Sequence, residues 1–533
     1  MNVAASENQL LATRTWFYLI LLGGLVLRFF VFLDIYQSDP AVFVATPASL
    51  LAEHLYFTAL TEHFWEYIWF SHTVTLATIF KDWFVFSFFP AGYAPLANLV
   101  IVSVADLLAS GLVYLALRNF STPNWLAFIA AVLLSIRLLA WDLWYMAGGW
   151  DLFNPFMLAL LVWSFSNYWI KKSPRSAFAI GGAGLFVVTS LQTAAVVAIP
   201  AIFLFILIAS KRRLDVKAMS YALIPPLLML GALVFKNGVQ HGVYAPTSGA
   251  GQNIIQNLNL ALTSPTATGA LELGEKLNYP DWWAWCYREA ERLGLWNQKN
   301  ISGFYGTCNR SSKGYTYVEL KKYLQKTNNK KILKIVEQDE KILTEKPWLF
   351  AGRITVRSTK FSAIYGTISS KLLPDVLIKY PRNFIGRSYL NFTYLIANGP
   401  RFEIDYPYVS KRLPDIVNKL SNFLEPILRT GMYLSYFLTA FIPLWYIASL
   451  TFSSKLSKPS KLDGIVWTLC VSFCFGTLAN VTTHCCESYR HAFLFMPIIF
   501  TILVYFGYRV IVILYPSSLL KRYGLPSIPG HKS

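Results

Sequence analysis

Long apolar runs separated by polar loops dominate this sequence of 533 residues. A helix needs about 20 mostly apolar residues to cross a bilayer, and the chain has a series of segments near this length. The pattern predicts an all-α polytopic membrane protein with about ten transmembrane helices. Two adjacent segments are short, so a helical hairpin or a re-entrant turn remains an alternative over 177–210. The predicted spans are 16–34, 92–116, 124–145, 150–169, 177–193, 194–210, 218–236, 430–452, 463–483 and 491–514.

Basic residues in the short loops indicate how the predicted spans are oriented. Cytoplasmic loops of membrane proteins carry an excess of Lys and Arg. These residues all fall on one side if the amino terminus is cytoplasmic and the chain crosses ten times. No small-residue cleavage site follows the first apolar run, so we interpret that run as a retained span. The basic loop residues are Arg14, Arg118, Lys171, Lys172, Arg175, Lys211, Arg212, Arg213, Lys217, Lys455, Lys458, Lys461, Lys521 and Arg522.

This topology divides the chain into three parts. Residues 1–236 form an amino-terminal transmembrane module with an outer loop over 35–91, and residues 237–429 form an extracytoplasmic domain. Residues 430–533 form a carboxy-terminal transmembrane module and a cytoplasmic tail. Segment 48–86 of the outer loop is rich in aromatic residues at near-helical spacing, which predicts one or two helices lying in the membrane interface.

The predicted outer domain contains no apolar run long enough to span. It mixes helical patterns, such as that from Tyr317 to Glu345, with turns rich in Gly, Pro and Asn. We therefore expect a mostly α-helical domain. Cys286 and Cys308 lie within it and could form a disulfide if the domain faces an oxidising compartment.

Composition agrees with a membrane protein and changes how the net charge is interpreted. Hydrophobic residues make up 55% of the chain and charged residues only 14%. A soluble protein carries about 25% charged residues, so most of this chain is expected to lie in lipid. The formal net charge is +19. In a membrane protein such an excess is typical of basic cytoplasmic loops and of contacts with anionic lipid or phosphate, so nucleic acid is not an expected partner.

Polar and ionisable residues gather at the outer ends of the predicted spans. Such groups are costly at a membrane boundary unless they are hydrated or paired, so several of them on one face indicate a site. A solvated helix end is the alternative explanation for each residue taken singly. The candidates are Asp34, Asp39, Asp151, Lys236, Asn237, Glu487, Arg490 and His491.

Several stretches resemble the GT-C membrane glycosyltransferases. Asp39 after the first span is similar to the acid of their first loop, and the segment from Pro90 to Leu96 resembles a Pro-x-x-Tyr-x-Pro-Leu motif whose tyrosine is Tyr93. Asp151 lies where these enzymes have a second acidic residue. The segment from Glu487 to Pro497 looks like their Glu-x-x-Arg-Tyr-x-x-Pro motif.

The likeness covers about residues 15–240 and 465–515. Within the GT-C enzymes, the chain resembles the dolichyl-phosphate-mannose-protein mannosyltransferase-like group. Lys236-Asn237 resembles a turn seen in some bacterial members. This chain departs from the family pattern where Pro40 follows Asp39 in place of a second acid, and where a large outer domain separates spans seven and eight. The resemblance therefore implies the enzyme class and a GT-C-like bundle, but not the acceptor.

The implied reaction is the transfer of a hexose or pentose from a polyprenyl-phosphate carrier to a glycan, lipid or protein acceptor, with inversion. A carboxylate is the simplest base for the acceptor hydroxyl, and Asp39 is the first candidate, with Asp34 the second. Arg490 is the first candidate to stabilise the leaving phosphate, followed by Lys236 and His491. The remaining candidates for substrate binding are Asp151, Asn237, Glu487 and Tyr93.

Three points stay open at this level. A divalent metal shared by Asp39 and Asp151 is one alternative to metal-free catalysis. A transporter or flippase of a lipid-linked or anionic substrate is an alternative function, for which Asp106 and Arg137 within the spans are the discriminating residues. A non-enzymatic assembly protein is a further alternative function. The predicted location is the inner or plasma membrane in a bacterium, or the endoplasmic reticulum membrane in a eukaryote, with the active site on the non-cytoplasmic face.

Overall fold

The computed structural model of the chain is a bundle of long helices. It describes residues 3–40, 56–70, 76–145, 154–190, 192–210, 215–245, 330–346, 412–451, 460–483 and 495–514, together with some single positions. Every regular element in these ranges is a helix. The predicted all-α class is therefore confirmed for the described part of the chain.

The described part of each predicted span falls on a long helix, but the number of membrane crossings stays a prediction. Among the described residues, 4 helical stretches are long and apolar enough to cross a bilayer, namely Ala12–Ser38, Ala91–Asn119, Val216–His241 and Leu413–Ala448. Shorter apolar helices cover Asn124–Ala140, Ala198–Ala209, Leu462–Leu478 and Met496–Val512. The long helices are α1 (Val3–Ser38), α5 (Ala94–Asn119), α6 (Asn124–Tyr145), α7 (Asn154–Lys171), α8 (Pro174–Ser190), α9 (Gln192–Ala209), α10 (Val216–His241), α20 (Glu425–Thr451), α21 (Lys461–Thr483) and α23 (Met496–Leu514).

One continuous apolar core joins helices from both halves of the sequence. It runs from α5 to α10 and continues into α20, α21 and α23. Small residues bring some of these helices close together, as is common between helices in membranes. A Cβ atom at Gly181 of α8 would lie only 2.4 Å from the carbonyl oxygen of Tyr221 on α10. Glycine at this position therefore sets the distance between the two helices.

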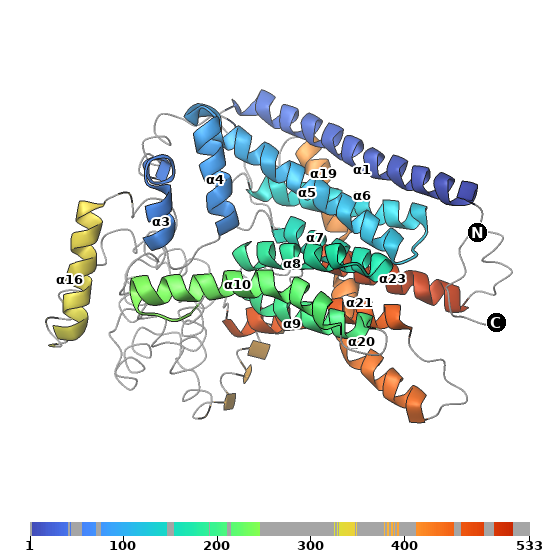
Figure 1. Cartoon of the computed structure of the whole chain (residues 1–533). Helices are drawn as coiled ribbons and strands as arrows, with labels where there is room; N and C mark the ends of the chain where they lie inside the picture. The colour runs from blue at the N-terminus through green and yellow to red at the C-terminus, as the bar shows by residue number, and fades with distance from the viewer. Residues whose placement is uncertain are drawn as a thin grey trace.

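Three shorter helices stand at one end of the bundle. They are α3 (Phe64–Phe70), α4 (Leu76–Phe88) and α16 (Lys330–Glu345), and they lie where α1 and α10 end and α5 begins (Figure 1). Both chain termini lie toward the opposite end (Figure 1). The aromatic segment of the first loop thus contains helices α3 and α4, as predicted.

A fourth short helix, α19 (Arg412–Phe423), lies against α1 and α6 and leads directly into α20. Its buried face packs Val417 against Val31 and Ile35 of α1 and against Leu139 and Ala140 of α6. The end of the 237–429 segment is therefore part of the helical bundle.

Local sequence explains where α5 begins and where α10 ends. Pro90 precedes the 3₁₀ turn η2 (Ala91–Tyr93), and Pro95 occupies the first turn of α5, where its missing N–H is tolerated. At the carboxyl end of α10, Gly242 has a φ of +71°, a left-handed conformation that favours glycine and ends the helix.

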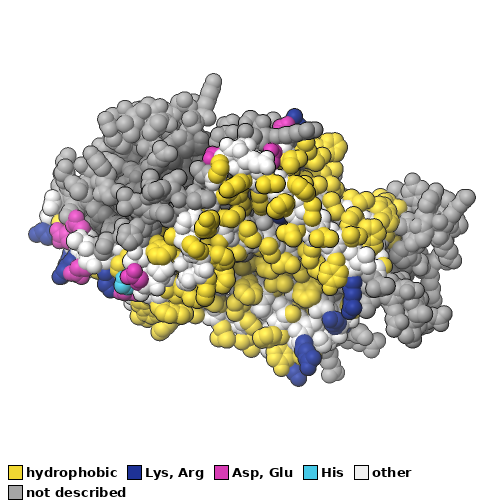
Figure 2. All heavy atoms as spheres, turned by 90° about the horizontal axis from the view of Figure 1, so that it is seen from above, with side chains coloured by type: hydrophobic (Ala, Val, Ile, Leu, Met, Phe, Trp, Pro, Cys, Tyr) yellow, Lys and Arg dark blue, Asp and Glu magenta, His cyan; other side chains and the backbone are white. Residues whose placement is uncertain are grey.

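One face of the described bundle is largely apolar (Figure 2). Figure 2 shows hydrophobic side chains covering the middle of one face, with charged side chains toward its margins. Exposed large apolar residues occur along α1, α10 and α20, for example Phe29, Phe235 and Phe437. Contiguous apolar surface of this extent is typical of helices that face lipid.

Candidate functional site

The candidate residues that the structure describes lie at the end of the bundle that carries α3 and α4. They are Asp34, Asp39, Tyr93, Lys236 and Asn237. The other four candidates, Asp151, Glu487, Arg490 and His491, lie outside the described residues. How these four stand relative to Asp39 therefore stays a prediction.

The two carboxylates proposed as the base have different surroundings. Asp34 is half-buried near the end of α1, and its carboxylate accepts a hydrogen bond from the backbone N–H of Leu413, at 3.0 Å. Asp39 is half-buried just beyond the last turn of α1, where its own N–H donates to the carbonyl of Ile35 at 2.8 Å. Asp34 thus holds the start of α19.

Tyr93 lies in the 3₁₀ turn before α5 and is 55% exposed. Its ring is therefore available to solvent, lipid or a ligand.

Lys236 and Asn237 are buried near the end of α10, where both contact backbone carbonyls. The Nζ atom of Lys236 donates to the carbonyl oxygen of Ile68 at 3.1 Å, and the side-chain amide of Asn237 donates to that of Ala245 at 2.9 Å. A ring nitrogen of His241 lies 2.8 Å from the carbonyl oxygen of Phe70. Lys236 and His241 therefore meet the last carbonyls of α3, the end of a helix that favours positive charge.

A second set of contacts joins α3 to the segment around α16. The ammonium of Lys346, just after α16, pairs with the carboxylate of Glu66 and lies over the ring of Phe70 at 5.2 Å. His63 stacks on Trp348 with ring centroids 4.4 Å apart. These contacts join the segment around α16 to α3.

A buried polar cluster on α4 is the main feature at this end that the sequence did not suggest. Lys81 is 8% exposed, and its ammonium hydrogen-bonds the carboxylate of Asp82 and the side-chain oxygen of Asn98 at the start of α5. The Tyr56 hydroxyl donates to the other oxygen of Asp82 at 2.8 Å. Burial, with a smaller effect of Asp82, raises the pKa of Tyr67 well above its usual value, so this phenol stays neutral.

Helix α4 turns its two charged residues inward, together with the apolar Leu76, Ile79 and Val85, and exposes three phenylalanines. Lys81 and Asp82, its two charged residues, face the bundle, whereas Phe80, Phe84 and Phe88 are exposed at helical spacing. The reverse is expected for a helix on a water-exposed surface. Two charges in an otherwise apolar segment were the available signal for this cluster, but spacing alone does not tell which face they occupy.

Three charged side chains lie buried within the bundle on neighbouring helices. Arg28 of α1 donates to the hydroxyl of Ser135 on α6 at 3.0 Å. Arg137 of α6 donates to the carbonyl oxygen of Ser421 on α19 at 3.0 Å and also bonds its hydroxyl. Asp106 of α5 is fully buried. Arg137 thus hydrogen-bonds α19, which gives this arginine a packing role.

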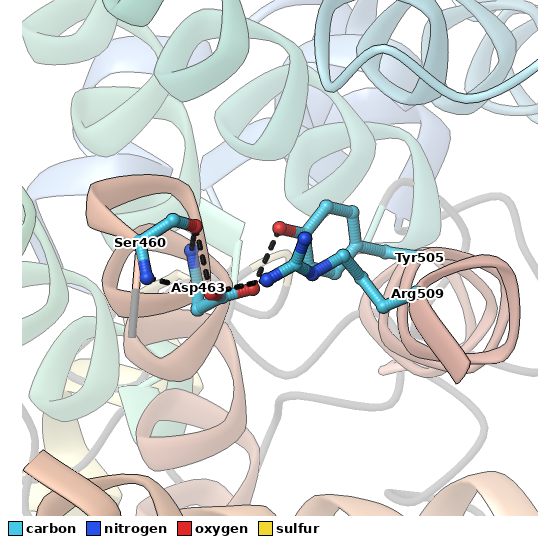
Figure 3. Close-up of polar contacts among 4 residues, drawn as sticks. All are labelled: Ser460, Asp463, Tyr505 and Arg509. Carbon is cyan, nitrogen blue, oxygen red and sulfur yellow. Dashed lines mark hydrogen bonds and ion pairs between the residues drawn. The ribbon is translucent and has the colours of Figure 1, made fainter. Parts of the chain in front are cut away.

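Another buried ionic cluster lies at the opposite end of α5 and joins α21 to α23 (Figure 3). The carboxylate of Asp463 accepts hydrogen bonds from the Tyr505 hydroxyl at 2.8 Å and from the Arg509 guanidinium at 3.0 Å. Ser460 and Asp463 also bond each other's backbone N–H, a capping box at the start of α21. The ring of Tyr505 lies 6.3 Å from that of Phe120, which follows the last turn of α5.

The described residues contain no group of three or more His, Cys, Asp or Glu side chains placed to hold a metal ion. The metal alternative involves Asp151, which lies outside those residues, as do Cys286 and Cys308. Comparison of the chain with protein families, with curated proteins and with solved structures found no match.

Proposed function

We propose that the chain is a multi-pass membrane glycosyltransferase that transfers a sugar from a polyprenyl-phosphate carrier to an acceptor on the non-cytoplasmic face. The observation that carries the proposal is the position of Asp39. It follows the apolar helix α1 at the same end of the bundle as the aromatic helices α3 and α4 and the exposed Tyr93. An acid beside apolar and aromatic surface suits a donor with a sugar phosphate at the membrane surface and its tail in lipid.

Asp39 is the base in this proposal, and Asp34 is a positioning residue. A base must reach the acceptor hydroxyl, either directly or through one water. The Asp34 carboxylate already binds the N–H of Leu413, which suits a structural role. The leaving phosphate is a weak base and needs stabilisation of its charge more than an acid, a role proposed for Arg490.

The test is transfer of labelled sugar from a polyprenyl-phosphate donor in membranes that contain the full chain. Asp39→Asn is expected to lower the transfer rate by at least about 100-fold, the lower range for loss of a general base. Glu345→Gln is the matched control, because this glutamate forms an exposed ion pair with Lys341 on α16. Full activity of Asp39→Asn would contradict the proposed base.

The second candidate is a transporter or flippase of a lipid-linked or anionic substrate. It is favoured by Asp106, because a charge buried within an apolar helix often marks a substrate or ion path. An Asp106→Asn variant separates the two functions. If it abolishes movement of a labelled lipid across vesicles while sugar transfer is absent from the parent chain, the transporter replaces the transferase.

A further inference from the structure

Helix α19 is bound to the bundle at both of its ends by a charged side chain. At its start, the Asp34 carboxylate accepts from the N–H of Leu413 at 3.0 Å. At its end, the Arg137 guanidinium donates to the carbonyl of Ser421 at 3.0 Å. We call Asp34 and Arg137 the two latches. They come from α1 and α6, respectively.

The sign of each latch matches the end of the helix that it holds. The first amides of a helix have no acceptor within the helix and carry partial positive charge, and the last carbonyls carry partial negative charge. A carboxylate at the start and a guanidinium at the end are therefore the stabilising arrangement. Hydrogen bonds that involve a charged group are also stronger than neutral ones.

Between the latches, α19 has apolar residues both on the face that packs against the bundle and on its exposed side. Val417 is 3% exposed and packs on α1 and α6, whereas Ile416, Leu420 and Phe423 are exposed by 43%, 46% and 74%. The exposed residues recur at helical spacing and continue into Ile427 of α20, which is also exposed. One face of α19 thus contacts the bundle and the other faces outward.

In a bilayer, the two latches contribute most of the attachment of α19 to the bundle. Apolar contact between helices gains little over contact with lipid, because lipid chains are as apolar as the side chains. Val31, Ile35, Leu139 and Ala140 would meet an apolar surround whether α19 or a lipid chain covers them. The attachment of α19 therefore depends mainly on its polar bonds to Asp34 and Arg137.

We propose that α19 is a gate over the seam between α1 and α6, held shut by Asp34 and Arg137, and that its release admits the chain of a phosphate-bearing lipid. The chain would lie on Val31, Ile35, Leu139 and Ala140, and the freed guanidinium of Arg137 would bind the phosphate. The gate requires only that the bundle lies in a bilayer. It goes beyond the proposed transferase and does not depend on it.

The test measures how fast a cysteine beneath α19 reacts with N-ethylmaleimide in membranes. The full chain keeps Cys470 and has its other cysteines replaced by serine, and Val417→Cys is the reporter. Ile416→Cys, on the outward face of the same turn, is the matched control. With both latches intact, the reporter is expected to react at least about tenfold more slowly than the control.

Asp34→Asn and Arg137→Met are then introduced singly. Each is expected to raise the rate at Val417→Cys by about tenfold or more, the effect of losing one charge-assisted hydrogen bond, and to leave Ile416→Cys within about twofold. Vesicles of a lipid with a phosphate headgroup should speed the reporter reaction further than vesicles of a neutral glycolipid.

Two results would overturn the gate. One is an unchanged rate at Val417→Cys in both latch variants. The other is an equal rise at Cys470, which is buried in α21 away from α19, because that would mean that the whole bundle loosens. A change in sugar transfer in either latch variant would concern the transferase alone, since the labelling does not require activity.

Discussion

Arg28, Arg137 and Asp463 each lie within an apolar helix, and each is hydrogen-bonded to a second helix. A buried charge is costly when it has no partner. When it is hydrogen-bonded to a polar group on a second helix, it fixes the position of the two helices relative to each other. Asp463 serves twice, because it caps its own helix and binds Tyr505 and Arg509 on α23. At this scale the bonds select one arrangement of helices that apolar packing alone would leave loosely specified.

Removing Asp463 is expected to destabilise the bundle strongly. Asp463→Ala leaves Arg509 buried without its carboxylate partner, which costs about 3–5 kcal/mol. The measurement is thermal unfolding of the purified chain in detergent. Lys341→Ala is the control, because Lys341 pairs with Glu345 on the exposed side of α16 and its loss should cost below about 1 kcal/mol.

A double variant tests whether the pair acts as a unit. Asp463→Ala combined with Arg509→Met should be less destabilised than Asp463→Ala alone, because the unpaired guanidinium is gone. Losses that simply add would contradict a direct interaction between the two residues.

At the scale of helices, side-chain volume and polarity decide which faces meet. Helix α8 approaches α10 closely at Gly181, whereas at the neighbouring Gly182 a Cβ atom would meet nothing within 4 Å. Helix α4 directs Lys81 inward and Phe84 outward. Both features follow from which face packs on protein and which faces the surroundings.

Adjacent glycines on α8 offer a matched pair of substitutions. Gly181→Ala is expected to cost about 1–3 kcal/mol, because the new methyl group meets the backbone of α10. Gly182→Ala should be neutral or stabilising by about 0.5–1 kcal/mol, because alanine favours the helix. Thermal unfolding of both variants measures the difference. Equal effects would mean that α8 and α10 are further apart than described.

The exposed aromatic face of α4 is expected to contact acyl chains. A bimane label at Phe84→Cys should be quenched by lipids with brominated acyl chains, because the outward face of α4 is apolar. A label at Lys341→Cys on the exposed side of α16 should not be quenched. Quenching at neither position, with the protein inserted, would place α4 outside the lipid.

At the scale of the molecule, one end of the bundle carries α3, α4 and α16 and the other end carries the chain termini (Figure 1). The described candidates Asp34, Asp39 and Tyr93 lie at the first end, whereas the cluster around Asp463 lies near the end of α5. The apolar middle of the surface separates these ends. The described candidate residues thus gather at one end of the bundle.

Labelling of single cysteines with a membrane-impermeant maleimide tests the predicted topology. Ser121→Cys and Lys172→Cys, in the short exposed loops before α6 and α8, should be protected in intact cells or right-side-out vesicles. Tyr244→Cys, after α10 and 76% exposed, should react there. Reaction of all three from one side would contradict the orientation derived from the basic loops.

The positions of the long helices and the apolar character of their surfaces could be read from the sequence, because both depend on the local spacing of hydrophobic residues. The same spacing predicted helices in the aromatic segment that contains α3 and α4. The sequence also predicted that Asp34, Asp39 and Lys236 lie at one end of the bundle, because the order of the helices sets where each begins and ends.

Only the tertiary structure decided what these side chains bind. Asp34 meets Leu413 across 379 positions of the chain, and Arg137 meets Ser421 across 284. It also showed that Lys81 faces the bundle rather than water. Spacing cannot reveal such partners, because they depend on how helices that are distant in the sequence pack together.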